Sequence, residues 1–404
     1  MVHLVAVVLF AAAALGLALV ALQTLLVRRH VATPVAAIAG AGRPPISILK
    51  PLCGLDDGLW ESLVLFADLD YPAYEVMLGV KNAADPAWHL ACAAVRRWPE
   101  RFRAVLQRGE PGLNPKVNQL LTLAREARHD LLVVSDSNVR VDRGYLAEIA
   151  GLLADEGVGL VTHPVVGVGE ARLGSLFDHL HLAGAVAPGV IAAKRLAGRD
   201  VVVGKSMALR RADLVRMGGF EAVKDVLAED FVMGVLVSER LGKRVALAPT
   251  PVRNVSERRT IVDFSGRYRR WAVLQRQLVG PFVYAAQALL NPVLLAAGGL
   301  ACERSGLAAA GFAGACLLKA ALDGASAQVL RPSGFSARQL ALVPAKDLVF
   351  GAAWAYGLVR RDVLWRGKRL LVGEGSRIDS GLVAESPVGG HGEAATAPTP
   401  SFTI

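Results

Sequence analysis

The stretch VVSDSNVRV, residues 133–141, interrupts an apolar, β-branched run with three polar residues before Val139 resumes it. Residues 131–134 have the composition of a buried strand, and Asp136 follows almost directly. A carboxylate at the end of a buried strand is costly unless a cation accompanies it. In α/β sheets, ligands bind beyond the carboxyl ends of the strands. The stretch therefore predicts a strand that delivers Asp136 to a binding site containing positive charge.

The segments around this strand alternate between short apolar runs and stretches with helical spacing. Between Ile46 and about Leu247, segments such as LWESLVLFADL and KVNQLLTLAREARHD separate the runs ISILK, EVMLGV, RAVLQ, LLVVSD, GVGLVTHP and RVALAP. Strands that alternate with helices indicate βαβ units and a mostly parallel sheet. We therefore expect an α/β fold with its ligand site at the carboxyl edge of the sheet.

The amino-terminal segment has the features of a membrane anchor. Residues 2–27 contain no Asp, Glu, Lys or Arg and are long enough to span a bilayer. Arg28, Arg29 and His30 follow at once, so the positive-inside rule places the next domain in the cytoplasm. The alternative is a cleaved signal peptide, which would carry a positive region before a shorter apolar stretch. We expect an uncleaved anchor.

The carboxyl-terminal part is apolar again and then becomes polar. Candidate membrane segments cover residues 281–301, 306–322 and 339–359. The third contains Lys346 and Asp347, and such an adjacent pair of opposite charges indicates an interfacial or re-entrant element. Three full spans would place the basic WRGKR segment outside, against the positive-inside rule, so the number of spans stays open. From about residue 376 the composition predicts disorder.

Composition limits the classes of partner. The 404 residues are 53% hydrophobic and carry a formal net charge of +10. Arginines crowd beside apolar segments, which favours an anionic membrane surface or a phosphorylated substrate and argues against nucleic acid. The four cysteines lack zinc or C-x-x-C spacing and fit reduced, structural thiols. P-loop, dinucleotide and nucleophile-elbow motifs are also absent from the sequence.

Acidic residues recur near the predicted strand ends. Asp85 follows EVMLGV, Asp136 follows LLVVS, and Glu229 and Asp230 lie in VLAEDFVMG. Each has a purely structural explanation, because Asp before Pro caps a turn and a Glu-Asp pair often begins a helix. Their recurrence instead indicates one shared cleft. One carboxylate could hold a divalent metal against a diphosphate, and another could act as a general base.

A basic motif follows the predicted α/β domain. RYRRW, residues 267–271, could neutralise a leaving diphosphate. By itself it is more typical of a juxtamembrane basic patch with an interfacial tryptophan. His163, His179 and His181 lie in or near apolar sequence, where structural or interfacial roles are favoured over catalysis.

The order of these motifs resembles the ceramide glucosyltransferase family, membrane-bound glycosyltransferases with the GT-A fold. The resemblance covers roughly residues 46–275, and it rests on an ordered set of short matches. These are KPL (50–52), LDYPAYEV (69–76), DP (85–86), NPKVNQL (114–120), SDSNVRV (135–141), GLVTH (159–163), GKSMALRR (204–211), LAEDF (227–231) and RYRRW (267–271).

The resemblance implies a Rossmann-like GT-A domain, with a mostly parallel sheet, on the cytoplasmic side of a membrane. Its parts would be an anchor at 1–30, the glycosyltransferase domain at 44–275 and membrane segments at 276–362. A tail at 363–404, basic and then disordered, would lie in the cytoplasm or periplasm. We expect an integral membrane protein of a bacterial inner membrane.

The resemblance also implies roles for individual residues. Donor binding is expected of Asp85, Lys116 and Asp136, and Asp136 would also hold a divalent Mg or Mn ion. Asp230 would be the catalytic base that deprotonates the acceptor hydroxyl. The residues expected near the diphosphate and the acceptor entrance are Arg267, Arg270 and Trp271.

The implied reaction moves glucose or N-acetylglucosamine from a UDP-sugar to the hydroxyl of a membrane lipid, by single displacement with inversion. Ceramide and a hopanoid-type lipid are alternative acceptors. A processive polysaccharide synthase also uses three aspartates and a basic-x-x-R-W motif, but it would need a longer bundle of membrane helices. A non-catalytic scaffold is the remaining alternative, and the retained acidic residues argue against it.

The sequence departs from the family pattern in two places. Ser137 and Asn138 follow Asp136, so any metal would rest on Asp136 and on oxygens of the donor. Ala187 stands before Pro188, where eukaryotic ceramide enzymes carry a histidine, and this leaves the acceptor open. The stretch 176–193 is apolar enough to lie in the membrane surface and meet a lipid.

Overall fold

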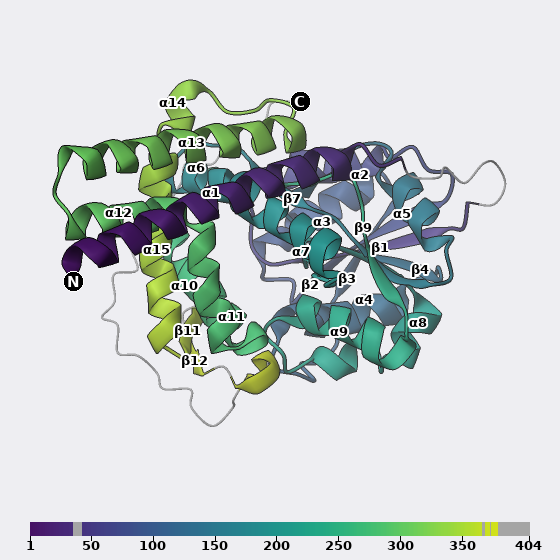
Figure 1. Cartoon of the computed structure of the whole chain (residues 1–404). Coiled ribbons are helices and arrows are strands. Elements are labelled where there is room, and N and C mark those ends of the chain that lie inside the picture. Colours follow the sequence, from purple (N-terminus) through teal and green to yellow (C-terminus); the bar gives the residue numbers. More distant parts are fainter. Residues whose placement is uncertain (35–42, 366–367, 372, 379–404) are drawn as a thin grey trace.

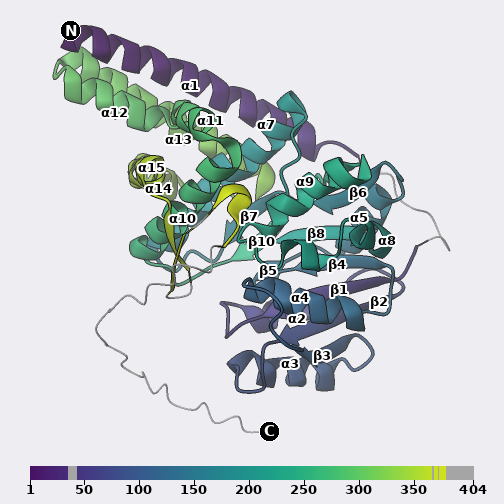
Figure 2. The same cartoon turned by 90° about the horizontal axis from the view of Figure 1, so that it is seen from below.

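The computed structural model describes residues 1–34, 43–365, 368–371 and 373–378 (Figure 1). The predicted anchor is one helix, α1 (Val2–Val31), with Arg28, Arg29 and His30 in its last turn. Basic side chains at this end also complement the negative end of the helix dipole. In Figures 1 and 2, α1 runs from the edge of the sheet domain along a bundle of apolar helices.

The α/β domain is built on a seven-stranded sheet with the strand order β3-β2-β1-β4-β8-β6-β9. Only β8 runs antiparallel to its neighbours β4 and β6, so the predicted mostly parallel sheet is confirmed. The strands are β1 (Ile46–Leu52), β2 (Tyr74–Val80), β3 (Phe102–Leu106), β4 (Leu131–Ser135), β6 (Val158–Thr162), β8 (Ser206–Arg210) and β9 (Arg244–Leu247).

Both faces of this sheet are covered by helices, which explains the continuous apolar runs in the sequence. Successive residues of β1 point to opposite faces. Ile48 belongs to one apolar core, and Leu49 belongs to the other. The helices of the domain are α2 (Leu59–Ala67), α3 (Pro86–Arg97), α4 (Pro115–Glu126), α5 (Tyr145–Leu153), α8 (Arg211–Arg216) and α9 (Glu229–Leu241).

Local sequence determines where two of these helices begin. Both α3 and α4 have Pro at the first helical position, preceded by a capping residue. Asp85 accepts a hydrogen bond from the Ala87 N–H, and Asn114 accepts from the N–H groups of Lys116 and Val117. Such caps satisfy backbone donors that have no partner within the helix. The two predicted donor-site segments are therefore anchored at helix N-termini.

A smaller sheet connects the α/β domain to the helices that follow. Its strand order is β5-β10-β7, from β5 (Val139–Arg140), β10 (Val252–Val255) and β7 (Val165–Val168). β5 is the strand in which the opening stretch resumes after its polar residues. Beyond β7 and β10 lie α6 (Leu173–His181) and α10 (Ile261–Val279), which contact each other.

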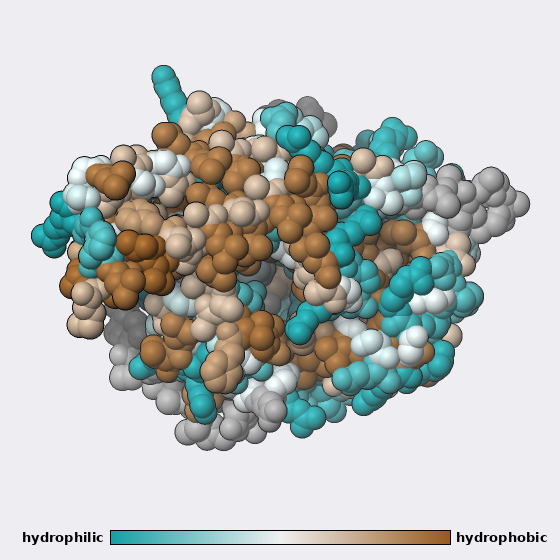
Figure 3. Space-filling view, in the orientation of Figure 1, coloured by the Kyte–Doolittle hydropathy of each residue, from teal (hydrophilic) through white to brown (hydrophobic). Residues whose placement is uncertain are grey.

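The remaining helices form an apolar bundle. Figure 3 shows hydrophobic surface gathered over α1, α12 and α13, whereas hydrophilic residues dominate the side of the α/β domain. The elements are a π-helix η2 (Leu182–Val186), α7 (Ala187–Ala197), α11 (Pro281–Ala286), η4 (Gln287–Leu290), α12 (Pro292–Cys302), α13 (Gly306–Leu330), α14 (Ala337–Leu340) and α15 (Val343–Val359).

Within the described residues, four helical segments are long and apolar enough to cross a bilayer. They are Val2–Val31, Leu173–Ala197, Gly306–Leu330 and Ala337–Val359. The expected segment at 281–301 is divided into Pro281–Leu290 and Pro292–Cys302, which meet at 81°. Pro292 accounts for the break, because a proline inside a helix removes a hydrogen bond and clashes with the preceding turn. The pair is a broken span or a re-entrant loop.

The charged pair in the third predicted membrane segment belongs to a buried cluster between α13 and α15. Lys346 Nζ lies 2.6 Å from Asp347 Oδ1, and Lys319 Nζ lies 2.5 Å from Asp323 Oδ1. Cross-helix ion pairs of 3.4 Å (Lys346–Asp323) and 3.6 Å (Lys319–Asp347) connect the two pairs. All four side chains are at most 5% exposed. We call these residues the buried quartet; their side chains face other parts of the protein.

The chain after α15 folds back onto the α/β domain. Strands β11 (Asp362–Trp365) and β12 (Lys368–Leu371) form a hairpin, which the basic composition of the tail did not predict. Ser376 is fully buried and accepts a hydrogen bond from the Ala228 N–H, immediately before α9. The predicted disorder concerns mainly residues 379–404, which lie outside the described residues.

Candidate active site

Asp136 follows directly after β4 and is surrounded by three lysines. Its two carboxylate oxygens lie 2.9 Å from Lys116 Nζ and 3.0 Å from Lys205 Nζ. The fully buried Lys50 donates to the Asp136 backbone carbonyl at 2.8 Å. Although burial opposes ionisation, Lys116 and Lys205 hold the pKa of Asp136 well below its usual range. The sequence led us to expect a bound cation beside Asp136, and the structure places the ammonium groups of Lys116 and Lys205 there.

The two lysines differ in their surroundings. Lys116 Nζ also lies 2.9 Å from Glu229 Oε1. Burial lowers the pKa of Lys116, but the charges of Asp136 and Glu229 outweigh burial and raise it. Burial lowers the pKa of Lys205, which has one carboxylate partner and faces the positive charge of Arg267. Lys205 also donates to Asn138 Oδ1 at 2.8 Å. Lys205 is thus the ammonium group less tightly committed to protein carboxylates.

Asp230 lies in the first turn of α9, beside the same lysine cluster. Its Oδ2 accepts a 2.6 Å hydrogen bond from the Gly204 N–H, and the Gly204 carbonyl accepts from Lys116 at 3.1 Å. Burial and the neighbouring charge of Glu229 raise the pKa of Asp230 to about 6, against the attraction of Lys116. Such a carboxylate is ionised at neutral pH yet basic enough to accept a proton.

The loop after β1 connects Asp85 with the Asp136 segment. The Gly54 N–H donates to Asp85 Oδ1 at 2.9 Å, and the Ser137 hydroxyl donates to Asp56 in the same loop. The carboxyl ends of β1, β2 and β4 therefore carry Asp56, Asp85 and Asp136 around one edge of the sheet. Asp85 has the structural role of a helix cap, in addition to any contact with a donor.

The basic motif lies on α10, where its two arginines have different environments. Arg267 is buried and forms a 2.9 Å ion pair with Asp178 of α6, and its guanidinium carbon lies 4.9 Å from the ring centre of Trp271. Despite burial, the pKa of Arg267 is raised, mainly by Asp178 and to a smaller extent by Tyr268 and Asp136. Arg267 therefore lies close enough to Asp136 for the two charges to interact. Arg270 makes no hydrogen bond or ion pair with any described residue. Burial, Arg267 and Arg259 lower the pKa of Arg270 to about 10.

The structure thus gathers most of the predicted site residues. Lys116 pairs directly with Asp136 and donates to the Gly204 carbonyl, while the Gly204 N–H donates to Asp230. Arg267 lies near them on α10, and Asp85 is joined through the loop after β1. Sequence reasoning missed the parts played by Lys205, Lys50 and Asp178. Lys205 and Lys50 lie in the motifs GKSMALRR and KPL, which already carried the family resemblance. Their place in these motifs was the available sequence signal. Asp178 lies in an apolar stretch, where a lone carboxylate calls for a buried partner.

The donor atoms for a metal are few. Within the described part of the chain, no three His, Cys, Asp or Glu side chains cluster so as to hold a metal ion. At the candidate site, Asp136 offers one carboxylate at the edge of the sheet, and its side chain is 21% exposed. This set fits a hard cation only if a bound ligand supplies the remaining oxygens and the lysines move aside.

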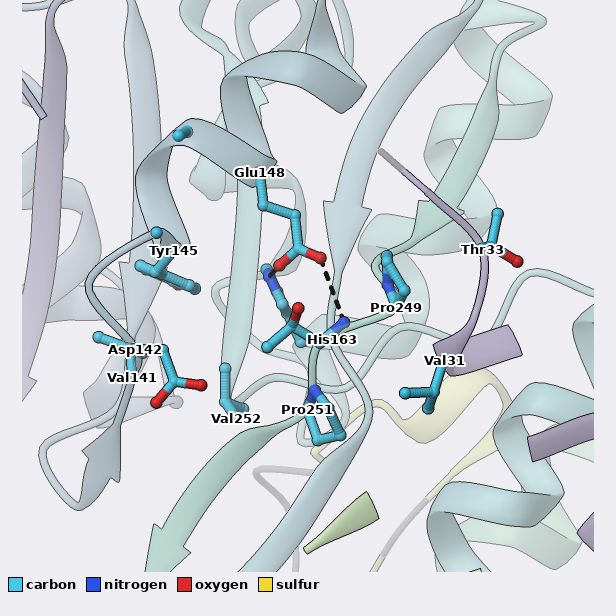
Figure 4. Close-up of a pocket in the computed structure, with 13 residues that line it drawn as sticks. Val31, Thr33, Val141, Asp142, Tyr145, Glu148, His163, Pro249, Pro251 and Val252 are labelled. Atoms are coloured by element: carbon cyan, nitrogen blue, oxygen red, sulfur yellow. Dashed lines mark hydrogen bonds and ion pairs between the residues drawn. The ribbon is translucent and has the colours of Figure 1, made fainter. Parts of the chain in front are cut away.

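A separate pocket of about 420 Å³ contains none of the predicted site residues. It lies between the end of α1, α5 and the segment before β10, and Figure 4 shows Glu148 and His163 facing each other in it. Glu148 Oε2 lies 3.6 Å from His163 Nε2. His163 also contacts Ser206 through Nδ1 at 2.9 Å. These contacts match the structural role expected of His163.

The sheet order and the site at its carboxyl edge define a GT-A glycosyltransferase fold. A mannosyltransferase from Pyrobaculum calidifontis, solved with GDP-Man and Mn²⁺, has a similar fold with a TM-score of 0.50 and 21% identity. The similarity covers 88% of this chain and 99% of that one. The sequence profile of glycosyl transferase family 21 matches residues 8–378, and the chain therefore belongs to that family.

Two curated relatives come from Caenorhabditis elegans. Ceramide glucosyltransferase 1 is 27% identical over 235 residues, and ceramide glucosyltransferase 3 is 28% identical over 239 residues. Each match covers 57% of this chain and 50% of the relative. The chain thus spans about half the length of the curated relatives it matches.

Proposed function

We propose that this protein transfers a sugar from a UDP-sugar to the hydroxyl group of a membrane lipid. The observation that carries the proposal is the position of Asp230, a carboxylate of raised pKa, within a cluster of cations suited to a diphosphate. A base and a leaving-group site side by side are what glycosyl transfer to a hydroxyl requires. Family membership and the ceramide glucosyltransferase relatives support the same reaction class.

The proposed reaction is a single displacement. The acceptor hydroxyl passes its proton to Asp230, its oxygen forms a bond to the anomeric carbon, and the bond from that carbon to the diphosphate oxygen breaks. UDP leaves with the additional negative charge, and the anomeric configuration inverts. The side chains of Lys205 and Arg270 are positively charged and can only donate hydrogen bonds. They therefore suit the negatively charged oxygens of the diphosphate, which accept hydrogen bonds. Lys116 pairs with Glu229 beside them.

A divalent Mg or Mn ion is part of the proposal. Asp136 would hold it together with oxygens of the donor, since the protein offers a single carboxylate there. When bound, such an ion would neutralise charge on the diphosphate. Lys116 and Lys205 would then lose a carboxylate contact and could turn toward the donor.

Metal removal should therefore lower transfer without abolishing it. We expect EDTA to reduce the rate of transfer by at least tenfold, with recovery on adding excess Mg²⁺ or Mn²⁺, because the lysines and Arg270 still stabilise the diphosphate. Initial rates with radiolabelled UDP-sugar measure this effect. Full activity in EDTA would remove the metal from the proposal and leave the cationic side chains as the only stabilising groups.

The acceptor side faces the apolar bundle. The stretch expected in the membrane surface forms α6, η2 and α7, and much of it packs inside the protein against α1, α10 and α13. We propose residues 44–275 as the catalytic domain, on the cytoplasmic side of a bacterial inner membrane, with 1–30 and 276–362 as membrane elements. Arg267, Arg270 and Trp271 would lie between the diphosphate and the lipid entrance.

An acceptor panel tests the proposal. Purified protein in nanodiscs is incubated with labelled UDP-glucose or UDP-N-acetylglucosamine and with ceramide, a hopanoid alcohol or diacylglycerol. A single labelled glycolipid supports the proposal and identifies its sugar and acceptor, with ceramide and hopanoid as the leading alternatives. A labelled polymer would instead identify a polysaccharide synthase, and the absence of any labelled product would refute transferase activity with these donors and acceptors.

A further inference from the structure

Asp178 is a buried acid on α6 that the proposed reaction leaves without a role. Its side chain is fully buried. Asp178 Oδ2 accepts from Arg267 Nη1 at 2.9 Å, and Oδ1 accepts from the Tyr268 hydroxyl at 2.8 Å. Arg259 Nη1 lies 3.8 Å from Oδ2. Both carboxylate oxygens are therefore bound by groups on or immediately before α10.

Apolar packing alone would hold α6 against α10 at lower cost. Phe177, which precedes Asp178 in the chain, meets Phe264 of α10 edge to face, with ring centres 5.7 Å apart. Replacing a buried ion pair by apolar residues of similar volume is often neutral or stabilising. A purely structural contact between α6 and α10 would therefore not require a buried carboxylate. Its effect on the position of the Arg267 guanidinium offers a better explanation.

The ion pair determines where the Arg267 guanidinium lies. That guanidinium is held at one edge by Asp178, and its central carbon lies 4.9 Å from the Trp271 ring centre, one helical turn along α10. A planar guanidinium with a fixed carboxylate partner has little freedom to rotate. Trp271 therefore packs against a guanidinium whose position is fixed by Asp178. Arg270 lies between Arg267 and Trp271 in the sequence of the same helix.

The Arg267 guanidinium also lies within electrostatic range of the donor site. Arg267 and Asp136 influence each other electrostatically, as do Arg267 and Lys205. A small displacement of Arg267 would consequently alter both the field at the Asp136 cluster and the position of Trp271. A misplacement of about 1 Å can lower a rate by about a hundredfold.

We propose that Asp178 is a positioning residue, which holds Arg267 and through it Trp271 in the orientation that sugar transfer requires. The inference rests on the proposed function. In it, Asp178 acts by holding Arg267 and does not contact the substrate. Asp178 acts from the helix that precedes η2, so it also connects the acceptor-side bundle with the basic motif.

The test compares Asp178→Asn with the matched control Asp213→Asn in the nanodisc assay. Asp213 is another buried acid with basic partners, Arg210 and Lys243, on α8 away from the site. We expect Asp178→Asn to lower kcat by about tenfold to a hundredfold. Asp213→Asn should keep kcat per folded molecule while it lowers the melting temperature. Equal kcat in Asp178→Asn and wild type would overturn the proposal.

A double-mutant cycle separates positioning from a general structural effect. If Asp178 acts through Arg267, Asp178→Asn should cause no further loss of kcat in an Arg267→Ala background, whereas multiplying losses would contradict this. Asp178→Glu retains the charge and should recover part of the activity; it also serves as the test variant if Asp178→Asn does not fold. Should wild-type protein transfer no sugar, the proposed function fails first, independently of these comparisons.

Discussion

Asp230→Asn is expected to lower kcat by about 10²–10⁴-fold, because the acceptor hydroxyl loses the group that takes its proton. The amide has nearly the same shape and can still accept the Gly204 N–H that Asp230 accepts at 2.6 Å. Binding of UDP-sugar, measured by calorimetry, should therefore change little. A variant that transfers sugar at the wild-type rate would show that Asp230 is not the base.

The pH dependence of the wild-type enzyme provides an independent check of this residue. The active form of Asp230 is the carboxylate, and its pKa is raised to about 6 by burial and by Glu229. We expect kcat to be constant above this pKa and to fall about tenfold per pH unit below it. An ordinary aspartate would keep the enzyme active to about pH 4. The residual rate of Asp230→Asn should lack this step, and an identical step in the variant would assign it to another group.

Breaking the buried quartet should cause the largest loss of stability. Lys346→Met removes one of two buried ammonium groups and leaves Asp347 and Asp323 to share Lys319. Leaving a buried charge without its partner costs about 3–5 kcal/mol, so we expect the free energy of unfolding to fall by that amount. Chemical or thermal unfolding in detergent micelles, followed by tryptophan fluorescence, measures the change.

The double variant Lys346→Met/Asp347→Leu is the matched control. It removes a neutral pair and keeps the 2.5 Å contact between Lys319 and Asp323. Because well-packed apolar residues often replace a buried ion pair without loss, the double variant should be more stable than the single one. If both are destabilised equally, packing volume rather than charge balance governs this part of the bundle.

Much of the fold could be predicted because its signals are local. The apolar run of α1, the alternation of strands and helices, and the Asp-Pro and Asn-Pro starts of α3 and α4 depend on residues close together in the chain. The break at Pro292 shows the limit of hydropathy, which detects an apolar segment and does not report its direction. The hairpin at 362–371 pairs two strands that are neighbours in the chain, but β11 also packs against α10, which lies far away in the sequence.

The candidate site divides in the same way. The sequence alone placed Asp136 at the end of a buried strand and indicated a cation beside it, because strand composition and burial costs are properties of neighbouring residues. Only the tertiary structure decided that Lys116 and Lys205 supply that charge, that Asp178 holds Arg267, and that the buried quartet pairs across α13 and α15. The physical reason is that an ion pair depends on distance and burial, and both arise from packing between segments far apart in the chain.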